Sequence, residues 1–242
     1  MDLGIGGKTA LVTASSKGLG RASAAALSAE GARVAICGRG REALSEAEGA
    51  LRRGGAEVLA IEADVTEPGS PARLVGETVA AFGGLDILIA NAGGPPAGRA
   101  LEVDDAALAA ALNANLLTSV RLVREAVPHM RARGWGRICC ITSYVIKQPA
   151  PNLSLSNAAR TGLWAWAKTA AADLFPDGIT LNLACPGAHA TERMKQLGGA
   201  EAGAMGDPAD FGRIVAFLCS GAASFLSGAA VQVDGTATTG LL

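Results

Sequence analysis

Residues able to hold a metal ion are scarce in this sequence. Among its 242 residues there are two histidines and five cysteines, and the cysteines stand at positions 37, 139, 140, 185 and 219 without a CxxC pair. An odd number of irregularly spaced cysteines matches neither a disulfide framework nor the spacing of a zinc site. We therefore predict no metal site and expect reduced thiols in the core. Cys139 and Cys140, adjacent in an apolar strand, should point to opposite faces.

An excess of charge of either sign is also lacking. The chain has 21 Lys and Arg against 22 Asp and Glu, a formal net charge of −1, which excludes the basic footprint of a nucleic-acid-binding protein. No apolar run approaches membrane-spanning length, and the start MDLGIGGKTALV lacks the long apolar core of a signal peptide. We expect a cytoplasmic protein whose partner is a small or carrier-bound substrate, with neither nucleic acid nor membrane.

Short apolar segments alternate with alanine-rich, helix-favouring segments along the whole chain. The apolar segments lack clean alternation, which is typical of strands buried on both faces of a parallel sheet. This order predicts an α/β protein: a single-domain Rossmann fold over residues 1–242, with a doubly wound seven-stranded parallel sheet flanked by helices. The expected strands are 8–13, 33–37, 57–61, 86–90, 137–142, 179–184 and 230–234, and the expected helices 18–30, 40–53, 70–82, 103–132, 152–174 and 207–220.

A glycine-rich turn follows the first expected strand. In TASSKGLGRASAAAL, Gly18 and Gly20 open a helix, and the missing side chains let backbone N–H groups approach a pyrophosphate at the positive helix end. Without the strand before them and the helix after them, two glycines would indicate no more than a tight entry turn. With that context, the turn predicts a dinucleotide site.

The end of the second expected strand indicates which dinucleotide. It reads Ile36-Cys37-Gly38-Arg39, so no carboxylate is present to bind ribose hydroxyls, whereas Arg39 stands where a 2′-phosphate would lie. Lys17 adds a second cation nearby, although either residue alone would also suit a solvated charge at a helix start. We predict NADP(H) in preference to NAD(H).

Further motifs occur in a fixed order from Lys8 almost to the C-terminus. TASSKGLG resembles a TGxxxGxG loop with Ala14 in place of the first glycine, and Asn91-Ala92-Gly93 resembles an NAG motif. The order and spacing are similar to those of classical short-chain dehydrogenases/reductases, in particular 3-oxoacyl-ACP reductase-like members. The resemblance implies a cofactor site of Thr13, Ser15, Ser16, Lys17, Gly18, Leu19, Gly20, Arg39, Asp64, Val65, Asn91, Ala92, Gly93, Arg160, Pro186, Gly187 and Thr191.

The same resemblance places the catalytic positions. Asn115 in NANLL resembles the helix asparagine that holds a water relay, and Ser143 in CITS resembles the substrate-orienting serine. Counted along the sequence from Ser143 and from Pro186-Gly187, the positions of the family's catalytic tyrosine and lysine are occupied by Ser156 and Arg160. The YxxxK motif is therefore absent, and the chain is an atypical member.

The two substitutions weaken proton transfer more than binding. A tyrosine, with a pKa near ~10, can be tuned to donate a proton to the developing alkoxide, whereas the hydroxyl of Ser156 ionises far less readily. Arg160 stays charged and cannot accept a proton, yet it could bind ribose hydroxyls. Losing positioned acid–base help costs about 10²- to 10⁴-fold in rate, so we expect a slow enzyme rather than an inert one.

Two other residues are candidate substitutes for the missing proton donor. Tyr144, the one tyrosine of the chain, follows Ser143; strand alternation turns it away from that serine unless a loop begins there, and otherwise it packs at the strand end. His189 lies two residues beyond Pro186-Gly187 and titrates near neutrality, the alternative being an ordinary surface-loop histidine. Trp164 and Trp166 are expected to pack against the sheet or a partner subunit.

Three hypotheses about function remain at this stage. The first is an NADP(H)-dependent reductase of a carbonyl or enone with a non-standard proton donor. The second is a nucleotide-binding pseudoenzyme, and the third is a redox-neutral enzyme, such as a cyclase or dehydratase, on the same scaffold. The resemblance also implies a homo-oligomer, dimer or tetramer, and a substrate-covering segment between Thr191 and Asp207 that is about ten residues shorter than usual.

Overall fold

The computed structural model describes residues 2–196 and 205–241, so the centre of the short segment after Thr191 lies outside the described residues. Seven parallel strands form one sheet in the order β3-β2-β1-β4-β5-β6-β7. The strands are β1 (Thr9–Val12), β2 (Arg33–Gly38), β3 (Val58–Glu62), β4 (Ile87–Ala90), β5 (Gly136–Ile141), β6 (Ile179–Pro186) and β7 (Ala230–Val233). This arrangement confirms the predicted doubly wound sheet.

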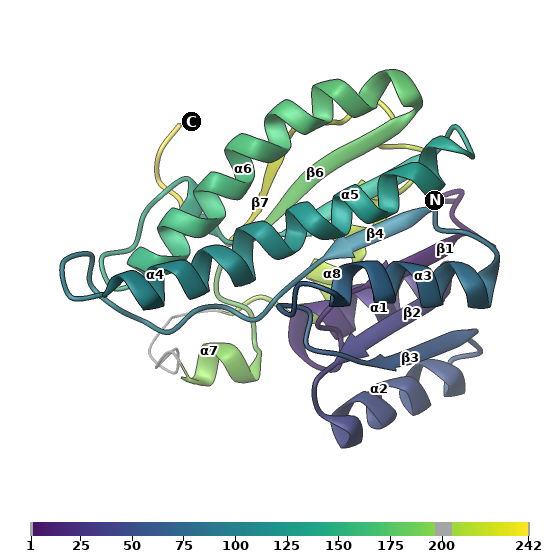
Figure 1. Cartoon of the computed structure of the whole chain (residues 1–242), viewed down its shortest axis with the longest axis horizontal. Helices are drawn as coiled ribbons and strands as arrows, with labels where there is room; N and C mark the ends of the chain where they lie inside the picture. The colour runs from purple at the N-terminus through teal and green to yellow at the C-terminus, as the bar shows by residue number, and fades with distance from the viewer. Residues whose placement is uncertain (1, 197–204, 242) are drawn as a thin grey trace.

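Helices cover both faces of the sheet and enclose two apolar cores (Figure 1). The core on one face contains side chains of α3 (Ser70–Phe82), α5 (Thr118–Arg131) and α6 (Ser154–Leu174). The core on the other face contains side chains of α1 (Gly18–Ala29), α2 (Arg41–Arg53) and α8 (Pro208–Leu218). Strands β1, β4, β5 and β6 are buried along their whole length, which explains why they lack polar alternation.

The expected helix 103–132 is interrupted. It consists of α4 (Asp105–Leu112), the π-helical turn η1 (Asn113–Leu117) and α5. Side chains hold the wider turn: the Thr118 hydroxyl donates to the Asn113 carbonyl, and the Asn113 amide donates to the Thr66 carbonyl. The short helix α7 (Glu192–Gln196), beyond β6, was also not predicted. Both features lie at the carboxyl-end edge of the sheet, where α4 and α7 appear in Figure 1.

One sequence expectation about membranes needs correction. The continuous helical stretch Asp105–Arg131 is 27 residues long and apolar enough, by length and composition, to cross a bilayer. In this fold it covers one face of the sheet, and α5 supplies Val120, Leu122 and Val123 to the core there. The core helix of a globular protein can be as long and as apolar as a membrane span, so one such helix is weak evidence that the chain crosses a membrane.

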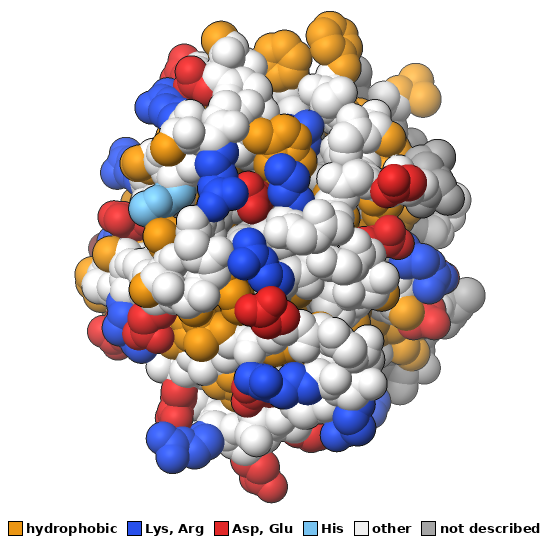
Figure 2. All heavy atoms as spheres, turned by 90° about the vertical axis from the view of Figure 1, so that its right-hand side faces the viewer, with side chains coloured by type: hydrophobic (Ala, Val, Ile, Leu, Met, Phe, Trp, Pro, Cys, Tyr) orange, Lys and Arg blue, Asp and Glu red, His pale blue; other side chains and the backbone are white. Residues whose placement is uncertain are grey.

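The surface shows no separation of charge on the face seen in Figure 2, the right-hand side of Figure 1. Basic and acidic side chains are interspersed across it, as the balance of 21 Lys and Arg against 22 Asp and Glu suggests. Ion pairs between partly exposed side chains, such as Arg73–Glu77 and Arg131–Asp177, occur on the protein surface as well. A face of this kind lacks the stripe of one charge with which proteins bind nucleic acid.

All five cysteines are buried and unbonded to one another. Cys139 faces one core and Cys140 the other, as predicted. Burial raises the pKa of the Cys37 thiol to about 11 and the pKa values of Cys140 and Cys219 to about 12. No group of three or more metal-binding side chains occurs within the described residues.

The buried thiols make stability dependent on alkaline pH. A thiol whose pKa is raised on folding contributes stability that is complete below the unfolded value of 9.0 and is lost as pH rises through the folded value. Each can remove up to about 1.4 kcal/mol per pH unit from the free energy of unfolding. Arg160, whose pKa burial lowers to about 10, opposes this trend only above that pH.

We therefore expect urea unfolding to show stability falling as the pH rises from about 9 to about 10. The same protein should react with a thiol-specific chromogenic reagent at pH 8 only after urea is added. Fast reaction of several thiols in native protein, or a flat stability profile, would contradict the described burial.

Candidate active site

The loop after β1 is fastened to both neighbouring strands. Asn91 N–H donates to the Thr13 hydroxyl (2.8 Å), which donates in turn to the Asn91 carbonyl (2.7 Å). The Ser15 hydroxyl donates to the Val12 carbonyl (2.6 Å) and accepts from Cys37 N–H (3.1 Å). Thr13 and Ser15 are fully buried. Both are predicted cofactor residues, and their side chains hold the loop in place.

The backbone of this loop turns sharply and packs closely against the start of α1, which explains why its residues are small. Ala14 has φ of 45°, a left-handed conformation that costs a non-glycine residue about 1–2 kcal/mol, so the alanine occupies a position better suited to glycine. A Cβ on Gly20 would lie 2.5 Å from the Ala14 carbonyl oxygen and 2.7 Å from Asn91 Nδ2. Asn91 Nδ2 also donates to that carbonyl (3.1 Å). Gly20 therefore lets α1 start directly against the loop.

The first turn of α1 is left open for an anion. Lys17 at its N-cap makes no side-chain cap bond, and no acidic residue lies in the first turn. By contrast, Asp104 caps α4 and Asp207 caps α8 through their carboxylates. A helix start without a cap leaves N–H groups unsatisfied and carries a partial positive charge. The α1 terminus thus has the donors that a pyrophosphate needs.

A cavity of about 410 Å³ lies beside this helix start. It gathers residues from the loop after β1, the ends of β2 and β3, the loop after β4 and the helix α4 with η1. Predicted cofactor or catalytic residues that line it are Ser16, Lys17, Arg39, Asp64, Val65, Gly93 and Asn115, together with Ala14. Thr191 lies outside this cavity but beside Gly18. The predicted cofactor residues Leu19 and Ala92 are partly buried and pack against the two cores.

Arg39 and Asp64 face each other at one end of the cavity. Arg39 Nη1 is 3.7 Å from Asp64 Oδ2, and the Arg39 side chain is 78% exposed. Partial burial pushes the Asp64 pKa upward, but hydrogen bonds from Thr66 N–H and the Thr66 hydroxyl, with the Arg39 charge, outweigh it and lower the pKa. Asp64 is therefore a fixed anion, whereas Arg39 is free to move toward a phosphate.

Asn115 is the residue whose surroundings indicate a polar ligand most clearly. It lies in the π-helical turn, is 3% exposed and lines the cavity. Neither Oδ1 nor Nδ2 has a hydrogen-bond partner within the part of the chain that the structure describes. A buried amide without partners costs about 1–3 kcal/mol, so a ligand or water is needed there. A dinucleotide therefore suits this cavity in two respects: its polar groups can bond to the Asn115 amide, and its pyrophosphate can bind at the start of α1.

Ser156 and Arg160 lie on the buried side of α6, each 8% exposed. Arg160 Nη1 donates to the carbonyls of Ile141 (3.0 Å) and Thr142 (2.7 Å) at the end of β5. Arg160 thus fixes the strand end that carries Ser143, and its remaining nitrogen atoms are left for a ligand.

The backbone leaves the strand at Ser143. Its side chain accepts a hydrogen bond from Val145 N–H (3.4 Å), and Tyr144 begins the 3₁₀ turn η2 (Tyr144–Ile146). Strand alternation therefore no longer fixes the direction of the Tyr144 side chain, which is half-buried. Tyr144 stays a candidate proton donor.

The expectation of a surface histidine at position 189 was wrong. His189 is 5% exposed, and its Nδ1 lies 3.2 Å from the Gly187 carbonyl oxygen. Its ring packs edge-on against Phe211 of α8, with centroids 5.2 Å apart, and against Gly206. A short loop after β6 folds back on α8 and carries the ring inward. The ring is therefore a packing element, which counts against it as the substitute donor.

Comparisons with known proteins agree with this geometry. The family profile described as Enoyl-(Acyl carrier protein) reductase matches residues 13–238. Human dehydrogenase/reductase SDR family member 4 is 32% identical over 242 residues, covering 94% of this chain and 86% of that protein. The chain belongs to the classical short-chain dehydrogenase/reductase family. It is similar to that family's 3-oxoacyl-ACP reductase-like members, and it is an oxidoreductase.

Two further members of the family carry more specific names. Cis-4-hydroxycyclohexanecarboxylate dehydrogenase of Sinomonas cyclohexanicum is 33% identical over 238 residues, covering 94% of this chain and 95% of that protein. The crystal structure of L-sorbose reductase from Gluconobacter frateurii, complexed with NADPH and L-sorbose, superposes with a TM-score of 0.91 at 32% identity, covering 97% and 98% of the two chains.

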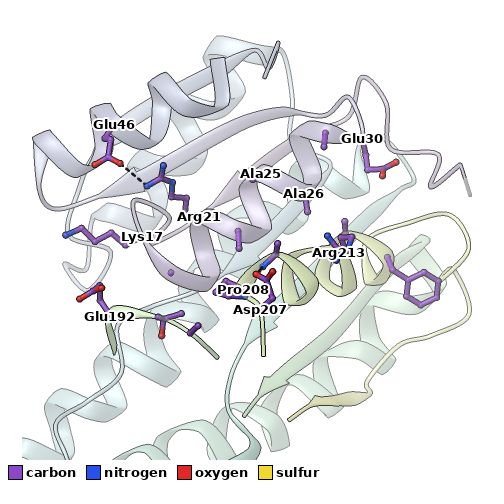
Figure 3. Close-up of a pocket in the computed structure, with 18 of the residues that line it drawn as sticks. Lys17, Arg21, Ala25, Ala26, Glu30, Glu46, Glu192, Asp207, Pro208 and Arg213 are labelled. Atoms are coloured by element: carbon purple, nitrogen blue, oxygen red, sulfur yellow. Dashed lines mark hydrogen bonds and ion pairs between the residues drawn. The ribbon is translucent and has the colours of Figure 1, made fainter. Parts of the chain in front are cut away.

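A larger hollow of about 1060 Å³ lies outside the dehydrogenase site, between α1 and α8. Figure 3 shows the Arg21–Glu46 ion pair at one rim, with Lys17 and Glu192 nearby and Asp207 and Pro208 at the start of α8. None of Asn115, Ser143 or Ser156 lines it. It meets the glycine-rich loop after β1 only at Lys17 and Gly18, with Thr191 beside them, so its size does not make it the reaction site.

Sequence reasoning missed two features of this dehydrogenase site. The π-helical turn that aims Asn115 has no hydrophobic period of its own, because it adds only one residue to a turn of an otherwise regular pattern. Arg193, on the unpredicted helix α7, donates from Nη2 to the Pro95 carbonyl (2.5 Å). No motif marks it, and only the fold brings residues 98 positions apart together.

Proposed function

We propose that this protein reduces the carbonyl or enone group of a small or carrier-bound substrate with NADPH. The observation that carries the proposal is the cavity beside α1, where predicted cofactor residues from four segments meet Asn115 of η1, whose amide has no hydrogen-bond partner among the described residues. The NADPH complex of the related L-sorbose reductase supports the choice of cofactor class. The hydroxy-acid dehydrogenase among the relatives supports chemistry between an alcohol and a carbonyl.

The preference for NADP(H) over NAD(H) rests on the end of β2. Arg39 is exposed, and the residue that follows it is Gly40 rather than an acid. A 2′-phosphate placed here would meet Arg39 and Lys17, two cations that line the same cavity. Asp64 attracts Arg39 from 3.7 Å but is already held by Thr66, so it leaves the guanidinium available.

Arg39→Gln should weaken NADPH binding by about 10- to 100-fold, since a hydrogen-bonded charge pair contributes about 1.5–3 kcal/mol. Binding of NADH should change by less than about twofold, because it lacks the 2′-phosphate. Arg41→Gln is the matched control, for Arg41 is also exposed but pairs with Glu62. Calorimetric titration measures the dissociation constants of NADPH and NADH for the parent protein and for both variants. Equal losses for NADPH and NADH would refute a phosphate-specific role.

The residues around the reacting carbon suit polarisation better than acid catalysis. NADPH, when bound, supplies the hydride. The hydroxyls of Ser143 and Ser156 donate hydrogen bonds to the substrate oxygen, while the buried charge of Arg160 stabilises the negative charge that develops there. Burial lowers the pKa of Arg160 to about 10, with a smaller effect of Arg193, so Arg160 is still cationic at neutral pH. We propose that water supplies the proton.

A second candidate function is NADP(H) binding without turnover. It is favoured by Arg160, whose Nη1 is committed to two main-chain carbonyls rather than left for ribose hydroxyls. A sensor or assembly partner would need the cofactor cavity alone.

Anaerobic mixing with NADPH and a panel of carbonyl compounds separates the two. The panel should contain L-sorbose, 4-oxocyclohexanecarboxylate, simple ketones and enones, and a 3-oxoacyl thioester. Loss of NADPH absorbance that depends on substrate concentration is the result expected for a reductase. Tight NADPH binding with no oxidation across the panel would instead establish the second candidate.

We further propose a cytoplasmic homo-oligomer, dimer or tetramer, assembled through α5 and α6. The half-buried Trp164 and Trp166 of α6 pack partly against the core of their own chain, which leaves part of each ring for a partner. Light scattering after gel filtration measures the mass directly.

A further inference from the structure

Asn113 ties the π-helical turn η1 to two other elements of the fold. Its Nδ2 donates to the carbonyl of Thr66 (3.0 Å), which lies 47 positions earlier in the loop after β3, and its Oδ1 accepts from Arg121 Nη1 (2.7 Å) on α5. Its own carbonyl oxygen accepts from the backbone N–H of Thr118 and from the Thr118 hydroxyl (2.9 Å). Both ends of the amide are therefore engaged, and the side chain is held in one orientation.

The cavity beside α1 is lined by both segments that Asn113 joins. Asp64 and Thr66 line it from the loop after β3, and Asn115 lines it from η1. The Thr66 hydroxyl and N–H hold the Asp64 carboxylate (2.7 and 2.9 Å), so one series of hydrogen bonds runs from Asp64 through Thr66 to Asn113. Asn113 thereby fixes Asn115, two residues further on, relative to the Asp64 end of the cavity.

The wide turn depends on this support. The α-helices α4 and α5 continue on its two sides, so an ordinary α-helical turn would be the default conformation, and π-helical turns occur mainly where function requires them. Successive residues of an α-helix are rotated by about 100°. Removing the extra residue from the turn would therefore change the direction of its side chains relative to α5 by up to about 100°, and Asn115 is one of these residues.

Resting on the reductase function proposed above, we propose that Asn113 is a positioning residue for the reaction. It keeps the wide turn in place and thereby holds the Asn115 amide in the cavity wall, at a fixed place relative to Asp64. Asn113 acts through Asn115, whose buried amide has no hydrogen-bond partner among the described residues. Its loss should therefore reduce the rate of reduction more than the affinity for NADPH, whose pyrophosphate binds at the start of α1.

The test measures kcat, KM and NADPH affinity for Asn113→Leu, Asn115→Ala and the variant that carries both substitutions. Asn113→Leu should lower kcat on the best carbonyl substrate by about 10- to 100-fold, because a displacement of about 1 Å in the active site can cost about 10²-fold in rate. KM and the NADPH dissociation constant should change by less than about threefold. In the Asn115→Ala background the same substitution should lower kcat by less than about threefold, because the effects of two residues that act through the same group do not add.

Asn182→Leu is the matched control for the loss of a doubly bonded amide. Asn182 on β6 donates to the Leu226 carbonyl (2.6 Å) and accepts from Ala229 N–H (3.1 Å), but it does not line the cavity. This variant should lose stability and keep kcat within about twofold of the parent value.

A milder pair of variants takes over if either asparagine substitution prevents folding. Thr118→Val removes one hydroxyl bond of the π-helical turn, whereas Thr78→Val removes a similar bond to the Leu74 carbonyl (2.7 Å) within α3. Both threonines are fully buried. Thr118→Val alone should lower kcat, by about three- to tenfold, and the loss should again disappear in the Asn115→Ala background.

Nuclear magnetic resonance provides a readout that does not need turnover. The side-chain amide signal of Asn115, assigned by its loss in Asn115→Ala, should shift when NADP⁺ binds to the parent protein. Asn113→Leu should reduce or abolish this shift although NADP⁺ still binds.

Three kinetic results would overturn the proposal while leaving the reductase function intact: an unchanged kcat in folded Asn113→Leu, additive losses in the double variant, or a loss of NADPH affinity alone. If NADPH binds but no compound oxidises it, the reductase function fails, and the Asn115 amide signal decides the role of Asn113. A shift of the same size in Asn113→Leu as in the parent protein would then refute that role.

Discussion

Gly20→Ala should bind NADPH about 100-fold more weakly than the parent protein, or not at all. The new methyl group would lie 2.5 Å from the Ala14 carbonyl oxygen and 2.7 Å from Asn91 Nδ2, and neither the backbone nor the tethered amide can retreat without moving the loop. Each hydrogen bond between a backbone N–H and a phosphate is worth about 1.5–3 kcal/mol. Displacing two of them accounts for the expected loss.

The same substitution should also destabilise the fold, by about 1–3 kcal/mol for a local overpacking. Gly76→Ala is the matched control: Gly76 lies within α3, and a Cβ there meets nothing within 4 Å. That variant should gain about 0.5–1 kcal/mol in the free energy of unfolding and leave NADPH binding unchanged. Urea unfolding and calorimetry measure both effects. An unaltered affinity in folded Gly20→Ala protein would show that the loop after β1 does not hold the cofactor.

Restoring the family's proton donor should raise the rate more than any other change. The double variant Ser156→Tyr, Arg160→Lys should increase kcat by about 10²-fold or more on the best substrate, because positioned acid catalysis is worth about 10²- to 10⁴-fold. The lysine amine replaces a guanidinium that now donates to the Ile141 and Thr142 carbonyls. The lysine ammonium can keep one of these two hydrogen bonds, and its positive charge then lies beside the new tyrosine hydroxyl.

The control for this variant is Ser156→Phe with Arg160→Lys. It introduces a ring of nearly the same size without the acidic hydroxyl, so packing changes appear equally in both proteins. A rate gain in the tyrosine variant alone, with a new ionisation in its pH–rate profile, is the expected result. If both variants turn over equally slowly, proton donation at position 156 does not limit the parent enzyme.

The strand positions could be predicted because a strand that is buried on both faces of a sheet consists almost entirely of apolar residues. Each such strand therefore stands out in the sequence as a short apolar segment. Cys139 and Cys140 illustrate this, since adjacent residues of an apolar strand had to enter different cores. The tight turn before α1 was equally predictable, because Gly18 has a positive φ and Gly20 leaves no room for a side chain, and both features are typical of glycines that open a helix. In these cases a local pattern determines the structure.

Features that depend on tertiary contacts were not predictable. The hydroxyls of Thr13 and Ser15 bond to backbone groups of β1, β2 and the residue after β4, and no local motif showed that they would. His189 was expected at the surface, but Phe211 and Gly206 enclose its ring. The π-helical turn at Asn115 and the contact from Arg193 to Pro95 arise only when distant segments meet. Nothing in the neighbouring sequence records such contacts.

The central claim is that the cavity beside α1 holds a phosphorylated dinucleotide. The most direct measurement is calorimetric titration of the folded protein with NADPH and, in parallel, with NADH. The account predicts one site per chain with NADPH bound at least about tenfold more tightly than NADH, in keeping with one charged contact to the 2′-phosphate. Absence of heat from either dinucleotide at millimolar concentration, with the protein shown to be folded, would contradict it.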